Sequence, residues 1–307
     1  MPRTLNRRSF LQHLSAGAGM LAAGSAVPAS VIAAPSESFT FAHLTDSHIT
    51  TERNAEKGMA QCFRKVNALT PDFVMTGGDQ VMDTMNATYD DAKKLFQLWQ
   101  NRQRDLDVPV HHVVGNHDIF GIHKNCPVSP THPQYGREMF KDYMGQGATY
   151  QSFNYKGWHF ILLDSVGTPP EKGYIGDVGE AQMDWLKADL EQTGKQTPII
   201  VATHIPVITL RGQTNKSTWD ANSHGVVIGN GNELRLLFEQ YNVKMVLQGH
   251  VHIIEQMEYA GIQYISSGAV CGDWWRGWRY SFPEGFGVIT CTGNTATWEY
   301  RDFGWEV

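Results

Sequence analysis

The chain has 307 residues, of which 41% are hydrophobic and 18% charged, and its net charge is −6. This composition excludes a disordered chain, and the length allows one large or two small hydrophobic cores. Because the chain is acidic, it is a poor partner for bulk nucleic acid or anionic lipid, and neither is expected to bind it.

The first 34 residues differ from the rest. Arg7 and Arg8 precede Ser9-Phe10-Leu11, and an uncharged stretch rich in alanine, glycine and serine then runs from Leu14 to Ala34. A charged start followed by a mild apolar run is typical of an export signal, and the arginine pair resembles the twin-arginine motif. We therefore predict a signal peptide at residues 1–34, export by the twin-arginine machinery, and a periplasmic or secreted protein.

An uncleaved membrane anchor is the alternative, because the apolar stretch approaches the length needed to span a bilayer. Pro28 and the many small residues disfavour it, so stable membrane insertion is not expected. Removal of the segment takes away three arginines and no acid, which changes the net charge from −6 to −9.

Residues 35–307 alternate strand and helix patterns and are predicted to form one domain. The first half reads as strand, helix, strand, helix, strand, which favours a sheet wrapped by helices. The predicted strands are 39–44, 73–75 and 110–114, and the predicted helices are 55–69 and 89–103.

Two irregular inserts, residues 119–150 and 206–231, interrupt this alternation, and connections of such length are often functional. A short helix is predicted near 134–143 inside the first insert. The period-two pattern of residues 253–302 predicts antiparallel strands, so two packed sheets with helices outside would accommodate the chain. The other predicted strands are 150–155, 158–163, 199–202 and 244–247, and the other predicted helices are 179–192 and 233–241.

Four cysteines occur, and none belongs to a C-x-x-C pair, so a thiolate metal site is not expected. In an oxidising compartment one or two disulfides could form, and the sequence does not choose the pairing. The cysteines are Cys62, Cys126, Cys271 and Cys291.

Residue types that bind metals follow five of the apolar strands or runs. One such residue after a strand is usually a helix cap or turn former, but five blocks in succession are harder to explain in that way. Clustered buried carboxylates and imidazoles would be costly unless a cation bound them. The blocks are Asp46-Ser47-His48, Gly77-Gly78-Asp79, Gly115-Asn116-His117-Asp118, His204 and Gly249-His250-Val251-His252.

The set D-x-H, G-D, G-N-H-D, H and G-H-x-H resembles the calcineurin-like metallophosphoesterase superfamily. It is most similar to the branch of class III cyclic-nucleotide phosphodiesterases and glycerophosphodiesterases. The resemblance implies an α/β fold, namely a four-layer α/β/β/α sandwich of two mixed sheets with a two-metal centre at the sheet edge. It places Asp46, His48 and His252 on one metal, Asn116, His204 and His250 on the other, Asp79 on both, and His117 as the catalytic histidine.

Carboxylate, imidazole and amide ligands suit Mn, Fe or Zn ions and do not choose among them. The resemblance implies a hydrolase of small phosphate esters, most simply a phosphodiesterase in which a metal-bridging hydroxide attacks phosphorus. A phosphomonoesterase and a non-catalytic binding scaffold are the alternatives. Asp118 is predicted either to orient His117 or to cap the segment that follows.

Purple acid phosphatases, a sister branch, carry a tyrosine ligand three residues after the bridging aspartate. Met82 occupies that position here, so the colour of a tyrosinate–iron centre is not expected.

Residues 268–280 are rich in tryptophan and arginine and could stack a base or sugar and hold a phosphate. We predict that Trp275, Arg276 and Trp278 bind substrate together with Arg211 of the second insert. The alternative is that the tryptophans pack beneath an irregular loop. Further candidates are Trp274, Arg279, His123, Lys124, Asn215 and His224.

Overall fold

The computed structural model describes residues 37–307. The predicted signal peptide lies outside these residues, so its twin-arginine motif and its cleavage stay predictions. None of the helices between residues 37 and 307 is both long and apolar enough to cross a membrane.

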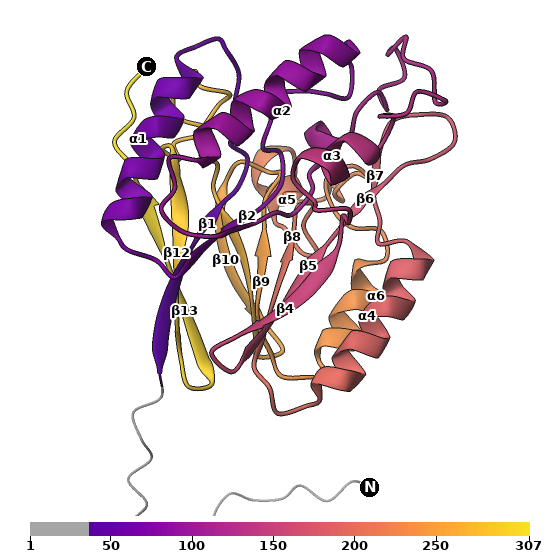
Figure 1. The fold of residues 1–307 in the computed structure, drawn as a ribbon. Helices are drawn as coiled ribbons and strands as arrows, with labels where there is room; N and C mark the ends of the chain where they lie inside the picture. Colours follow the sequence, from indigo (N-terminus) through magenta and orange to yellow (C-terminus); the bar gives the residue numbers. More distant parts are fainter. Residues whose placement is uncertain (1–36) are drawn as a thin grey trace, which may run out of the picture. The chain divides into compact units, whose positions relative to one another are not determined.

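The first large sheet has the strand order β13-β12-β1-β2-β3 (Figure 1). Its centre is parallel, because β2 pairs in the same direction with β1 and with β3. On the other side, β12 is antiparallel to β1, and β13 is antiparallel to β12. The strands are β1 (Ser38–Leu44), β2 (Phe73–Thr76), β3 (Val110–His111), β12 (Gly285–Thr292) and β13 (Thr295–Asp302).

The second large sheet has the order β10-β11-β9-β8-β5-β4. Four central strands are parallel, and the two edge strands β10 and β4 are antiparallel to their neighbours. The strands are β4 (Gln151–Tyr155), β5 (Trp158–Leu163), β8 (Ile199–Thr203), β9 (Val243–Gln248), β10 (Ile254–Tyr259) and β11 (Ile262–Ser267).

Helices cover the outer faces of the two sheets, with α1 and α2 along the first and α4 and α6 along the second (Figure 1). This confirms the predicted α/β sandwich of two mixed sheets. The helices are α1 (Ala55–Ala68), α2 (Tyr89–Gln103), α3 (Glu138–Tyr143), α4 (Glu180–Thr193), α5 (Arg211–Asn215) and α6 (Gly231–Phe238).

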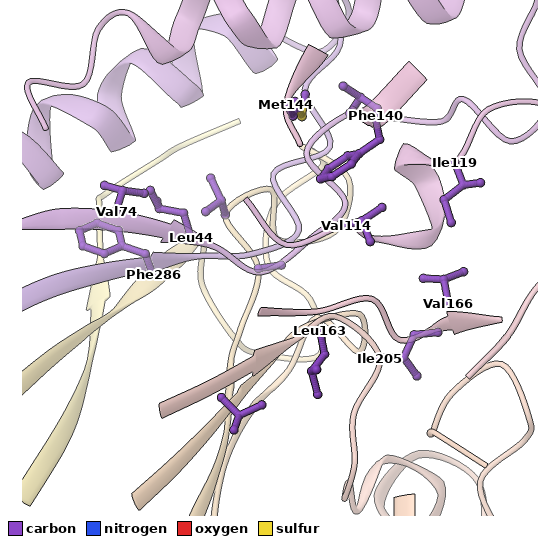
Figure 2. Close-up of a cluster of buried hydrophobic side chains, with 14 of the residues drawn as sticks. Leu44, Val74, Val114, Ile119, Phe140, Met144, Leu163, Val166, Ile205 and Phe286 are labelled. Carbon is purple, nitrogen blue, oxygen red and sulfur yellow. The ribbon is translucent and has the colours of Figure 1, made fainter. Parts of the chain in front are cut away.

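The core lies in separate layers because the strands bury both faces. Along β1, Phe39 and Phe41 point between the sheets, whereas Ala42 and Leu44 belong to the cluster that contacts the helices. Figure 2 shows part of that second cluster, with Leu44, Val74 and Phe286 grouped on the first sheet.

Two local features differ from the sequence prediction. The strand predicted at 110–114 ends at His111, because side chains replace the sheet partners of the next residues: Val113 N donates to Thr76 Oγ1 at 3.3 Å and Gln80 Nε2 donates to Val113 O at 2.8 Å. A small hairpin of β6 (Val166–Gly167) and β7 (Ile175–Gly176) was not predicted, since strands of two residues carry no periodic signal.

The strands of the 253–302 segment divide between the two sheets. β10–β11 and β12–β13 are antiparallel pairs, but β11 is parallel to β9 in one sheet and β12 is antiparallel to β1 in the other. A period-two pattern indicates a strand but not its partner, so the sequence could not assign this division.

A substitution of Phe41 tests the packing between the two sheets. Its ring stacks on Phe73 at 4.7 Å and meets Phe160 edge-on at 5.6 Å. Phe41→Ala is expected to lower the free energy of unfolding by about 3–5 kcal/mol, measured by denaturant titration, because it leaves a cavity that the sheets cannot close. Leu236→Ala on the exposed face of α6 is the control and should change it by less than about 0.5 kcal/mol; equal effects would contradict this packing.

Candidate metal centre

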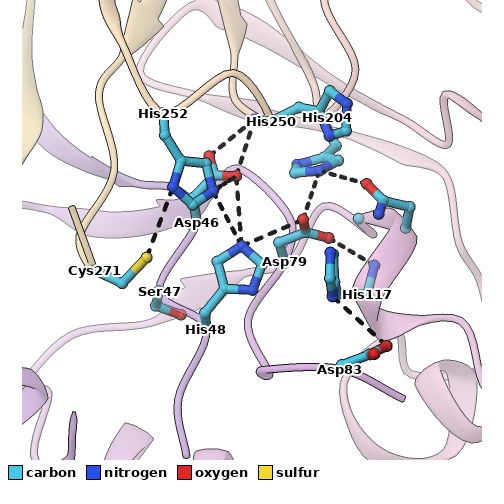
Figure 3. Close-up of polar contacts among 12 residues, drawn as sticks. Asp46, Ser47, His48, Asp79, Asp83, His117, His204, His250, His252 and Cys271 are labelled. Atoms are coloured by element: carbon cyan, nitrogen blue, oxygen red, sulfur yellow. Dashed lines mark hydrogen bonds and ion pairs between the residues drawn. The ribbon is translucent and has the colours of Figure 1, made fainter. Parts of the chain in front are cut away.

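The predicted ligand residues lie at the carboxyl ends of parallel strands from both sheets. Asp46 follows β1 and Asp79 follows β2, whereas His204 follows β8 and His250 follows β9. Figure 3 shows these side chains converging between the two sheets. The carboxyl edge of parallel strands is where open α/β sheets place their ligands.

Five of these residues have a left-handed backbone. The φ angles are 54° at Asp46, 40° at His48, 53° at Asp79, 70° at His250 and 54° at His252. Each such residue costs of order 1–3 kcal/mol and persists only where the surroundings fix it. Here Asp46 N donates to Gly78 O at 3.0 Å and His48 N donates to Asp79 O at 2.9 Å, which ties the two loops together.

Two glycines allow the loops to approach one another. A Cβ on Gly115 would lie 2.2 Å from both the backbone nitrogen and Oδ1 of Asp79. A Cβ on Gly249 would lie 2.1 Å from Thr45 Oγ1. Because these distances are far inside van der Waals contact, any side chain at either position would push a ligand loop away.

One group of potential metal-ligand atoms lies around His252. Its Nε2 lies 3.2 Å from Asp46 Oδ1 and 3.2 Å from His48 Nε2, and His48 Nε2 in turn lies 3.5 Å from Asp79 Oδ2. A second group surrounds His204, whose Nε2 lies 3.1 Å from Asp79 Oδ2.

The second group also contains Asn116 and His250. His204 Nε2 lies 3.2 Å from Asn116 Oδ1, and ligand atoms of Asp79, His204 and His250 all fall within 4.8 Å of one another. Asp79 Oδ2 therefore belongs to both groups, which is the position expected of a bridging carboxylate.

The orientation of the imidazoles fits a metal centre. The Nδ1 atoms of His48, His204 and His252 face the carbonyl oxygens of Met82, Gly77 and Gly272 at 3.3, 2.8 and 2.8 Å. If Nδ1 donates to each carbonyl, the Nε2 lone pairs are left pointing into the centre. The lone pairs of His48 and His252 would then repel each other at 3.2 Å unless a cation lay between them, so the residues fit bound metal ions.

The centre is buried, and burial and charge act on its groups in opposite directions. Burial alone would raise the pKa of Asp79, but the imidazoles of His204, His117 and His48 together outweigh it and hold that pKa well below its usual value. Burial lowers the pKa of His250 to about 3, so this imidazole is a neutral donor at physiological pH.

The four cysteines are buried free thiols, and no disulfide forms among them. Cys271 lies near the centre, with Sγ 3.9 Å from His252 Nδ1, and it could join His48 and His252 around an ion. Its sulfur faces the Nδ1 side of the His252 ring, opposite the Nε2 atom that meets Asp46. Burial raises the pKa of the Cys271 thiol, which disfavours the thiolate that binds metals.

Asp118 does not orient the His117 side chain. Its Oδ1 accepts from the backbone nitrogens of Gln80 and Val81 at 2.9 and 3.2 Å, and its Oδ2 accepts from Gly115 N at 2.9 Å. Asp118 does not cap the segment that follows either, because all three donors precede it; instead it fixes the turn that carries Asn116 and His117.

The carboxylate within ion-pair range of the His117 ring is that of Asp83, which was not predicted. Asp83 Oδ1 lies 3.6 Å from His117 Nδ1, within ion-pair range but longer than a hydrogen bond. The only sequence signal was a second aspartate four residues after Asp79. The backbone of His117 is held separately, because His117 N donates to Asp79 Oδ1 at 2.8 Å.

Trp275 is a core residue and does not bind substrate from this position. It is fully buried, and its Nε1 donates to the carbonyl oxygens of Ser47 and His48 at 3.0 and 3.1 Å. Its neighbour Trp274 instead lies over the centre, with its ring 4.1 Å from that of His48 and 5.0 Å from that of His252.

A cleft of about 220 Å³ opens onto the centre. Of the four predicted substrate residues only Arg211 lines it, whereas Arg276 and Trp278 are exposed outside it. Burial and the nearby Asp79 raise the pKa of Tyr174 to about 12, and Arg211 is close enough to oppose that rise. The lining residues are Asp79, His117, Tyr174, Arg211, Val226, His250, His252, Trp274 and Arg279.

Comparison with known proteins agrees with this geometry. Residues 39–253 match the family model described as calcineurin-like phosphoesterase. The chain belongs to the calcineurin-like phosphoesterase family. It is therefore a metal-dependent enzyme that hydrolyses phosphate esters, and the family depends on a dimetal centre.

Relatives with named activities are distant. The chain is 24% identical over 241 residues to a 3′,5′-cyclic-nucleotide phosphodiesterase of Nostoc sp., covering 76% of this chain and 78% of that protein. It is 23% identical to a manganese-dependent ADP-ribose/CDP-alcohol diphosphatase of Mus musculus, covering 59% and 63%. A dimetal phosphatase from Danio rerio shares the fold with a TM-score of 0.60 at 16% identity, covering 86% of this chain and 99% of that one.

Because Asp83 and Asp118 lie in different positions, we expect their substitutions to have different effects. Asp118→Asn removes an acceptor from buried backbone nitrogens and should lower the free energy of unfolding by about 1–3 kcal/mol, measured by denaturant titration. Met85 N donates to Asp83 Oδ1 at 2.9 Å, and Asp83→Asn keeps an oxygen that can accept this bond, so the free energy of unfolding should change by less than about 0.5 kcal/mol. Its kcat should instead fall about tenfold, because His117 loses the facing charge. The reverse pattern would restore the orienting role to Asp118.

Proposed function

We propose that the protein is an exported dinuclear phosphodiesterase that hydrolyses a small phosphate diester. The observation that carries this proposal is the position of Asp79 Oδ2, which lies 3.5 Å from His48 Nε2 and 3.1 Å from His204 Nε2. A single carboxylate oxygen shared by two groups of donors suits two ions held side by side.

We assign the seven predicted ligands to the two ions as the resemblance implies. Asp46, His48 and His252 would hold one ion, Asn116, His204 and His250 the other, and Asp79 both. The donors are nitrogen and oxygen without thiolate, which suits Mn, Fe or Zn. Bound there, the two ions would supply Lewis-acid charge and a water of lowered pKa.

The protein's own residues would position the ester and handle the proton. His117 lines the cleft beside Asp79, so it can donate a proton to the leaving oxygen. Its main chain is fixed by Asp79 and Thr84, whose Oγ1 donates to His117 O at 2.7 Å, which limits the movement of the ring. Trp274 covers the His48 side and would exclude water there.

A diester is favoured over a monoester by the charge of the cleft. Its two arginines are Arg211 and Arg279, and Arg279 is paired with Asp273. A terminal phosphate carries its second negative charge on the scissile group itself, so all of its charge must be met at one point, whereas a diester carries a single charge there. The cyclic-nucleotide phosphodiesterase named among the relatives is a further argument for a diester.

Activity on two chromogenic esters tests the proposal. The metal-loaded protein should hydrolyse bis-p-nitrophenyl phosphate with a kcat/KM at least about tenfold above that for p-nitrophenyl phosphate, a difference of roughly 1.4 kcal/mol in transition-state binding. His117→Ala should keep both ions by metal analysis and lose roughly 10²–10⁴-fold in kcat. Asp79→Ala should lose the ions as well as the activity.

Three results would change this conclusion. A preference for the monoester would favour the phosphomonoesterase. No turnover of either ester with two ions bound would favour a binding scaffold. Wild-type kcat in His117→Ala would remove that residue from the mechanism.

We also propose that twin-arginine export delivers the protein to the periplasm or the medium. This pathway carries folded proteins, so the buried centre could bind its metals before translocation. Replacing Arg7 and Arg8 with lysine should retain the protein inside the cell, measured by fractionation and immunoblotting. A control with Arg64→Lys, on the exposed face of α1, should be exported normally, and export of both variants would contradict the proposal.

A further inference from the structure

Arg211 is a cation in the cleft for which residues 37–307 supply no anionic partner. Its side chain lines the cleft together with Asp79, Tyr174 and His250. Within residues 37–307 its guanidinium forms no ion pair and donates no hydrogen bond, whereas the other arginine that lines the cleft, Arg279, pairs with Asp273. An unpaired, partly buried guanidinium is costly unless a ligand supplies the anion.

The backbone on both sides of Arg211 is fixed. Leu210 N donates to Glu255 Oε1 at 2.9 Å, and Gly212 N donates to Asn222 Oδ1 at 2.9 Å. Because Glu255 belongs to β10, the edge strand that follows the last ligand loop, Arg211 is attached to the sheet that carries the centre. Such preorganisation reduces the entropy lost when the side chain binds a ligand.

Arg211 lies on the His250 side of the centre. Tyr174 connects the two, because its ring meets that of His250 edge-on at 6.0 Å and it lines the cleft beside Arg211. Arg279 also lines the cleft, but its guanidinium is paired with Asp273. The scissile phosphate, placed over Asp79, would have its charge met by the ions, so Arg211 is left for another anionic group.

We propose that Arg211 binds a second phosphate of the substrate, adjacent to the scissile one, so that the preferred substrate is a diphosphate diester with a P–O–P link. This inference rests on the proposed phosphodiesterase function. The planar fork of arginine matches the oxygens of a phosphate and binds them bidentately. The cleft of about 220 Å³ is smaller than pockets that enclose whole small molecules, roughly 300–1,000 Å³, so a small charged link suits it better than a whole nucleotide would.

Hydrolysis of such a link needs only water. The water oxygen bonds to the scissile phosphorus, the bond from that phosphorus to the bridging oxygen breaks, and the bridging oxygen leaves on the second phosphate. The products are two phosphate monoesters, and the protons of the water pass to the products and the solvent.

Two adenosine substrates that differ in phosphate number test the role of Arg211. Adenosine 5′-(4-nitrophenyl phosphate) has one phosphate, and P1,P2-diadenosine diphosphate has two. Arg211→Gln should lower kcat/KM for the diphosphate roughly 10- to 100-fold, mainly through KM, and that for the nitrophenyl ester less than about threefold. Arg211→Lys should lie between, because it keeps the charge without the fork.

Two further variants separate charge from structure. Asn222→Ala should also lower kcat/KM for the diphosphate, because it removes the hydrogen bond that fixes the backbone beside Arg211. Arg64→Gln, which is exposed on α1, should leave kcat/KM unchanged for both substrates. Equal losses on both substrates, no loss on either, or a wild-type enzyme that cleaves only the nitrophenyl ester would overturn the second-phosphate site and leave the phosphodiesterase standing. Failure of the wild-type enzyme on both would overturn the proposed function itself.

Discussion

The carboxylate of Asp79 is the interaction on which the rest of the site depends. Its Oδ2 faces His48 on one side and His204 on the other, and its Oδ1 accepts the backbone N–H of His117. One side chain therefore joins donors from both sheets and also positions the candidate acid. Asp79 is buried, and the neighbouring imidazoles hold its pKa low, so its negative charge depends on the packing that brings these side chains together.

The strained loops follow from the same constraint. A ligand that follows a strand would ordinarily continue along the strand direction, but Asp46, His48 and His252 must turn inward toward one point. The left-handed backbone achieves this, and cross-loop hydrogen bonds between residues 46–49 and 78–80 hold it. Asp118 contributes to the same end, since three backbone N–H groups converge on its carboxylate. Bound cations would relieve the facing lone pairs that this geometry creates.

The walls of the cleft come from segments far apart in the chain. Tyr174 precedes α4, Arg211 belongs to the 206–231 insert, and Trp274 and Arg279 belong to the 268–280 stretch. None is a predicted metal ligand, and together they surround the opening above the centre. The centre accounts for the reaction class, whereas these four residues line the cleft in which the rest of the substrate would lie.

The sequence by itself determined the reaction class and most of the sandwich. Its ligand residues directly follow apolar strands, and parallel strands bring their carboxyl ends to one edge, so convergence followed from chain order. Only the tertiary structure decided between neighbours: Asp83 rather than Asp118 faces His117, and Trp274 rather than Trp275 covers the centre. Residues one or four apart in irregular loops point in directions set by local φ, which is positive at both tryptophans. Periodicity does not encode that choice, nor the sheet in which a late strand finds its partner.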